Sequence, residues 1–79
     1  MPRAIRMPDL GCARVVLSLW YAQPGDPVYA GDRLVEVLLE GATFDVPAPA
    51  TGILKDKLAF PDDPLVTGQI LGHIDEQEV

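Results

Sequence analysis

The chain lacks the sequence features that are typical of exported and membrane proteins. Cys12 is the only cysteine among 79 residues, so no disulfide can form within the chain. A small domain that folds without a disulfide is typical of a reducing compartment. The first residues contain no uninterrupted apolar stretch like that of a signal peptide, and no apolar run approaches the ~20 residues that span a bilayer. These absences favour a cytoplasmic protein that does not bind membranes.

Positive charge is also scarce. Six Lys and Arg stand against 12 Asp and Glu, which gives a net charge of −6 and a pI near 4.4. Sequence-independent affinity for nucleic acids comes from Lys and Arg that neutralise phosphates, and an acidic chain is repelled by phosphate and by anionic lipid. We therefore expect neither nucleic acid nor a membrane surface as a partner.

Helical patterns are missing as well. No segment keeps apolar residues at helical spacing for long, and a proline or glycine intervenes about every ten residues. The apolar share of 48% allows one small core, so we expect a single domain over residues 1–79. The pattern predicts an all-β fold, with short strands near residues 4–7, 15–21, 28–29, 34–39, 42–46, 53–58, 65–66 and 70–74.

The sequence repeats itself. A shift of 37 positions places residues 15–37 over residues 52–74 without a gap, and seven of the 23 pairs are identical. Proline, aspartate and glycine recur at the same corner in both copies, as turns require. Asp26, Asp62 and Asp63 are therefore interpreted as turn residues rather than as acid/base groups or calcium ligands. The repeat predicts two similar halves about a pseudo-two-fold axis.

Short segments along nearly the whole chain match one known pattern in order and spacing. They are residues 7–11, Trp20, residues 24–26 with Val28, residues 31–32 with Leu34, residues 36–37, residues 46–49, residues 52–54, Gly68 and residues 71–72. The series resembles the biotinyl/lipoyl domain family, and within it the lipoyl domains of 2-oxo acid dehydrogenase E2 acyltransferases. The resemblance implies a barrel-sandwich hybrid, a flattened barrel of two four-stranded sheets.

The resemblance also implies a place for the prosthetic group. In that family a lysine on the hairpin between the two halves carries the lipoyl or biotinyl group, and Gly41 stands at that place here, flanked by Glu40 and Ala42. Biotin carriers are less similar, since they keep Met on either side of the lysine. Because glycine has no side chain that could form the amide, we expect no lipoate cofactor. We also expect no catalytic residue and no metal, since the sequence shows no nucleophile with a base and no metal-ligand spacing.

The loop before Trp20 departs from the family too. Eight residues, 12–19, separate Gly11 from Trp20, fewer than the resemblance leads us to expect. In the family this loop lies beside the carrier hairpin and helps partner enzymes recognise the domain. Its shortening weakens the expectation of ordinary E1 and E2 recognition.

Three functions follow as hypotheses. The first is a non-enzymatic, unlipoylated lipoyl-like domain that acts as a protein-interaction or structural module, related to a 2-oxo acid dehydrogenase complex. The alternative is a genuine lipoyl or biotinyl carrier modified at a non-standard position, for which only Lys55 and Lys57 are available. The third, a module of a membrane-fusion efflux adaptor, requires a long helical hairpin between the halves. Leu39 and Ala42 are too close in the chain to leave room for one.

The turn is flanked by large apolar residues. Leu38 and Leu39 precede it and Phe44 follows it. Two interpretations are open: a twisted strand that buries both faces, or a patch for self-association or for a protein partner.

Other single residues carry weaker signals. Cys12 is read as an inert small residue rather than a reactive thiol, and His73, the repeat counterpart of Glu36, as an outward strand residue rather than a zinc ligand. Trp20 and Tyr21 are expected to serve packing, with the Trp ring as a main contributor to the core. No nucleophile with a base and no phosphate-binding loop is present.

Overall fold

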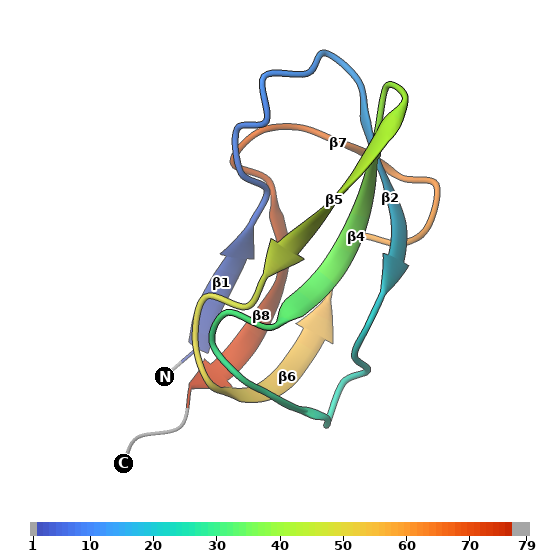
Figure 1. Ribbon diagram of the computed structural model, residues 1–79. Coiled ribbons are helices and arrows are strands. Elements are labelled where there is room, and N and C mark those ends of the chain that lie inside the picture. Colours follow the sequence, from blue (N-terminus) through green and yellow to red (C-terminus); the bar gives the residue numbers. More distant parts are fainter. Residues whose placement is uncertain (1, 77–79) are drawn as a thin grey trace.

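A computed structural model describes residues 2–76 of the chain and shows eight strands and no helix within them (Figure 1). The strands are β1 Pro2–Arg6, β2 Val15–Trp20, β3 Pro27–Val28, β4 Arg33–Leu39, β5 Ala42–Pro47, β6 Gly52–Lys57, β7 Pro64–Leu65 and β8 Ile70–Glu76. The predicted strands are all present, with ends that differ by at most two residues. Pro27 and Pro64 begin β3 and β7, which suits proline because the first residue of a strand need not donate to the ladder.

The strands form two four-stranded antiparallel sheets, ordered β1-β8-β6-β3 and β5-β4-β2-β7. The molecule is elongated, with extents of 39 × 19 × 17 Å, and the two sheets pack face to face along its length (Figure 1). This arrangement confirms the predicted all-β barrel-sandwich architecture. It leaves β5 and β7 at the edges of one sheet, and β1 and β3 at the edges of the other.

The two halves obey the repeat seen in the sequence. A shift of 37 residues carries the bounds of β2, β3 and β4 onto those of β6, β7 and β8. The turns match as well: the carboxylate of Asp26 accepts the backbone N–H of Gln23 at 2.9 Å, and that of Asp63 accepts the backbone N–H of Phe60 at 2.8 Å. Asp62 adopts φ +74°, a conformation that aspartate tolerates in turns. The predicted turn roles are confirmed.

Each half also contains a bulge at the same place. The pairing of β2 with β4 shifts between Leu17 and Leu19, and the pairing of β6 with β8 shifts between Leu54 and Asp56. A bulge inserts one extra residue into one strand and changes which face the following side chains occupy. These two bulges therefore set which side chains of β2 and β6 face the core, and further register shifts lie in the pairings of β4 with β5 and of β1 with β8.

The core lies between the sheets and is made of aliphatic side chains from both. Its largest fully buried members are Ile5, Leu17, Leu34, Leu54, Leu71, Ile74, Val35 and Val37. Trp20 is buried as predicted, and its indole N–H donates to the carbonyl of Ala59 at 2.9 Å. Tyr21 is 42% exposed, because the residue after Trp20 points to the outer face of the sheet, and its ring lies 5.0 Å from the Arg33 guanidinium there.

Candidate functional site

The hairpin between β4 and β5 projects from one end of the molecule, and its turn consists of Glu40 and Gly41 (Figure 1). At the opposite end Pro2 pairs with Asp75, where the described chain begins and finishes. Gly41 has φ +73°, in the left-handed region, and a Cβ built on it would meet nothing within 4 Å. The tip is therefore open to solvent, and its backbone conformation favours glycine.

Substitution of Gly41 is expected to test that conformation. Gly41→Ala should lower the free energy of unfolding by about 1 kcal/mol, because left-handed backbone is unfavourable for residues with a Cβ. Gly41→Asn is the matched control and should cost less, since asparagine tolerates this region. Urea unfolding measures both, and an alanine variant as stable as the wild type would contradict the turn geometry.

The apolar residues around the turn do not share one surface. Side chains directly opposite each other on paired strands lie on the same side of the sheet. Phe44 lies opposite the fully buried Val37, so Phe44 and Leu39 are on the inner side of the sheet; Leu39 packs against the core, whereas Phe44, near the end of the sheet, is 38% exposed. Leu38, between Val37 and Leu39, faces outward and is 43% exposed. The three side chains therefore do not lie on one side of the sheet, and their role in self-association or partner binding stays a prediction.

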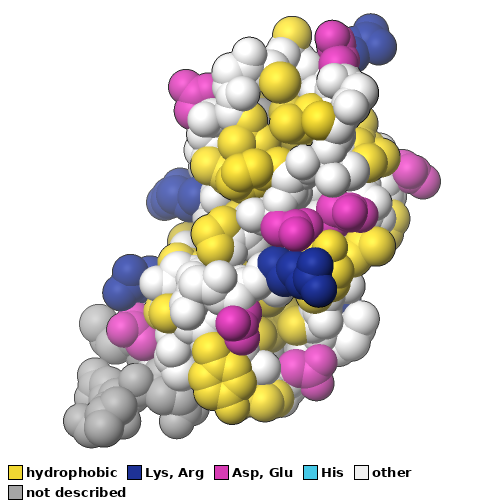
Figure 2. All heavy atoms as spheres, in the orientation of Figure 1, with side chains coloured by type: hydrophobic (Ala, Val, Ile, Leu, Met, Phe, Trp, Pro, Cys, Tyr) yellow, Lys and Arg dark blue, Asp and Glu magenta, His cyan; other side chains and the backbone are white. Residues whose placement is uncertain are grey.

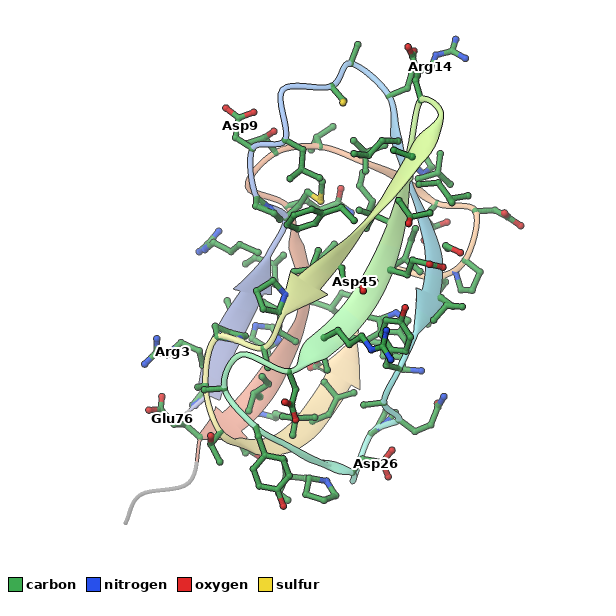
Figure 3. All side chains as sticks on the ribbon, viewed as in Figure 1. Arg3, Asp9, Arg14, Asp26, Asp45 and Glu76 are labelled. Atoms are coloured by element: carbon green, nitrogen blue, oxygen red, sulfur yellow. The ribbon has the colours of Figure 1, made fainter. Side chains whose placement is uncertain are left out.

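The loop between β1 and β2 lies at the same end as the hairpin tip (Figure 1). It is anchored by Leu10, which is partly buried against the core, and by the backbone N–H of Gly11, which donates to Asp9 Oδ1 at 3.0 Å. Cys12 is exposed in this loop, and Arg14 extends from its end near the hairpin (Figure 3). The described structure thus places the loop where the resemblance predicted it.

The two lysines lie on β6, away from the hairpin turn. Lys55 is exposed in the strand. Lys57 Nζ donates to Gln23 Oε1 at 2.8 Å and lies 5.4 Å from the centroid of the Trp20 ring. The Lys57 ammonium is therefore engaged in packing over an aromatic ring, and neither lysine occupies a tight turn.

Charged residues cross the outer face of the sheet β5-β4-β2-β7. Tyr21 donates its hydroxyl to Asp45 Oδ1 at 3.1 Å, and the Arg33 guanidinium lies 5.0 Å from the Tyr21 ring centroid and 3.9 Å from Asp45 Oδ2 (Figure 3). Desolvation, followed by the hydrogen bond to Asp45, raises the pKa of Tyr21 above its usual value. Next to them, Ser18 Oγ donates to Glu36 Oε2 at 2.9 Å. Sequence reasoning missed this network because it joins residues from three strands.

On the other sheet, His73 is half-buried and its Nδ1 lies 3.0 Å from Asp56 Oδ1. Glu36 and its repeat counterpart His73 therefore each have a partner on the neighbouring strand of their sheet. The outward position predicted for His73 is confirmed, while Asp56 as its partner was not foreseen. Among residues 2–76 no group of three or more His, Cys, Asp or Glu side chains is placed to hold a metal ion.

Two packed sheets related by an internal repeat, with a tight hairpin between the halves, define a protein of the lipoyl-domain class. The solution structure of the lipoyl domain of the 2-oxoglutarate dehydrogenase complex from Azotobacter vinelandii superimposes with a TM-score of 0.75, covering 95% of this chain and 98% of that one at 22% identity. Residues 3–74 match the biotin/lipoyl family described as "Biotin-requiring enzyme". The chain belongs to this family.

Relatives of known function are acyltransferase components. The chain is 35% identical to the succinyltransferase component of the 2-oxoglutarate dehydrogenase complex of Escherichia coli K12. The match extends over 74 residues, which are 91% of this chain and 18% of that protein. It is 34% identical over 62 residues to the acetyltransferase component of the acetoin cleaving system of Pseudomonas putida, and this match covers 78% of this chain and 17% of that protein. The chain thus spans less than a fifth of either relative. None of its described residues forms a helix able to cross a membrane.

Proposed function

We propose that this chain is a non-enzymatic, unlipoylated lipoyl-like domain that works through protein contacts, as an interaction or structural module associated with a cytoplasmic 2-oxo acid dehydrogenase type of assembly. The observation that carries the proposal is the hairpin turn. A carrier needs a nucleophilic amine on a long side chain at the tip, and the tip here is Glu40 and Gly41. The scaffold of a carrier is present without an acceptor atom.

The placement of the lysines supports this proposal over a carrier modified elsewhere. Lys55 lies at the bulge within β6, on a strand and away from the hairpin tip, and Lys57 is bonded to Gln23. An attached dithiolane at either position would lie along a sheet rather than swing from a hairpin tip. The family relationship to acyltransferase components is the reason for placing the partner in a dehydrogenase type of assembly.

Intact mass of the protein isolated from its own host tests the unlipoylated state. We expect the mass of the unmodified polypeptide. An added lipoyl or biotinyl group on the wild-type chain would overturn the proposal, and its loss in Lys55→Arg or Lys57→Arg would identify the acceptor.

A gain of modification tests the assignment of Gly41 to the carrier position. Co-expressed with a lipoate ligase, Gly41→Lys should gain lipoyl mass, because its side chain would project into open space. Glu40→Lys is the matched control, since it places an amine one residue away and should gain less. Equal modification of both variants, or of neither, would contradict the assignment.

A further inference from the structure

On the outer face of the sheet β5-β4-β2-β7, the half nearer the hairpin tip is apolar. Pro64, Val16, Leu38 and Thr43 lie directly opposite one another across the four strands and form one continuous row. Leu19, 39% exposed, lies further along β2 on the same face. Figure 2 shows hydrophobic side chains over the hairpin end of the visible surface, bounded by a band of acidic and basic side chains across its middle.

The other half of the molecule provides an internal comparison. The equivalent row on the second sheet is Pro27, Ile53, Asp75 and Pro2. Shifted by 37 residues, Leu38 corresponds to Asp75 and Leu19 to Asp56. The two faces share the same backbone geometry, yet one carries carboxylates where the other carries leucines. Packing of the fold therefore does not require leucine at either position.

A groove continues this face beyond the row. It is lined by the end of the β1–β2 loop, the start of β2 and the strand β7 with Val66, which is 67% exposed. Exposed apolar side chains that adjoin a groove are typical of surfaces that bind another protein. The row, Leu19 and this groove are together called the outer apolar face.

The charged residues around this face determine which kind of partner can bind to it. Glu36 and Asp45 lie opposite each other beside the row, Glu40 is at the hairpin tip, and Asp62 and Asp63 precede β7. The nearby cations are Arg14 in the groove and Arg33, which contacts Asp45. A second copy of the chain, also at net charge −6, would place carboxylates against carboxylates.

We infer that the outer apolar face binds a basic partner segment, a stretch of another protein that presents apolar side chains flanked by lysine and arginine. Leu19 and Leu38 contact the apolar side chains, and the surrounding carboxylates contact the cations. The inference deepens the proposed interaction role, on which it rests, but it is independent of whether the hairpin is modified.

The test uses a labelled peptide of alternating leucine and lysine, followed by fluorescence anisotropy at low and high salt. The wild-type chain should bind it, and Leu19→Thr/Leu38→Thr should bind about tenfold more weakly because the apolar contact is removed. The control Tyr29→Thr/Leu58→Thr removes two exposed apolar side chains outside the face and should stay within about twofold. Urea unfolding of both variants checks that the fold is retained.

Three results would overturn the inference. One is equal binding of the leucine–lysine peptide by the wild type and the Leu19/Leu38 variant. Another is equal wild-type binding of a serine–lysine peptide, which has the same charge without leucine. The third is a dimer of the wild type in sedimentation equilibrium that the Leu19/Leu38 variant abolishes, since a second copy would then be the occupant. The intact mass of the chain is measured separately, so failure here and failure of the unlipoylated state are distinguishable.

Discussion

Gly72→Ala is expected to destabilise the protein by about 3 kcal/mol or more, a large share of the stability of a small domain. Gly72 lies in β8 at the middle of its sheet, opposite Ile5 on one side and Lys57 on the other. A Cβ at this position would collide with the backbone carbonyl oxygen of Asp56 and lie 3.3 Å from the Trp20 ring. A backbone atom within a paired strand cannot move aside as a flexible side chain can.

Urea unfolding followed by the fluorescence of Trp20, the only tryptophan, measures this effect. Thr43→Ala is the control, because Thr43 is an exposed strand residue at which alanine should change the free energy of unfolding by no more than about 0.5 kcal/mol. A Gly72→Ala variant as stable as Thr43→Ala would show that β6 and β8 separate more easily at Asp56 than the structure indicates.

Local signals in the sequence were sufficient to predict the strands. Proline, aspartate and glycine mark each corner because their backbone preferences act without help from distant residues. The 37-residue repeat supported these predictions, because the turn predicted at Asp26 was predicted again at Asp63. The division into two four-stranded sheets came instead from the family resemblance, and the order of strands was not predicted, because pairings such as β1 with β8 join residues far apart in the chain.

The candidate site was harder to predict, because faces depend on register. Leu38, Leu39 and Phe44 are close in sequence, yet the pairing of Leu39 with Ala42 places Leu38 on the opposite side of the sheet from the other two. The two-residue turn already contained this information, because it sets the register of both strands. The contacts of Tyr21 with Asp45 and Arg33 had no local signal and needed the assembled sheet.

The bulges are the feature that simple alternation could not predict. In an unbroken strand Leu17 and Leu19 would face the same side. The extra residue Ser18 turns Leu19 outward, so that Leu17 is fully buried and Leu19 is 39% exposed. The repeat did indicate that Leu19 faces outward. Its counterpart in the second half is Asp56, and a charged residue is rarely buried without a partner.

Leu17→Ala and Leu19→Ala should therefore differ sharply. Leu17→Ala is expected to cost about 3 kcal/mol, because it removes buried methyl groups and leaves a cavity between the sheets. Leu19→Ala should cost less than about 1 kcal/mol, since much of its side chain already contacts water. The two substitutions remove the same atoms from the same strand, so the difference isolates the effect of the bulge.

Urea unfolding at equilibrium measures both variants, and the matched pair on the other sheet extends the comparison. Leu54→Ala should behave like Leu17→Ala, because both leucines are fully buried before equivalent bulges. Asp56→Ala, like Leu19→Ala, should lower the free energy of unfolding only slightly through lost packing. The loss of its contact with His73 adds a small further cost. Equal costs at Leu17 and Leu19 would mean that Leu19 is buried in solution, and the outer apolar face would then lose one of the two leucines that distinguish it from the second sheet.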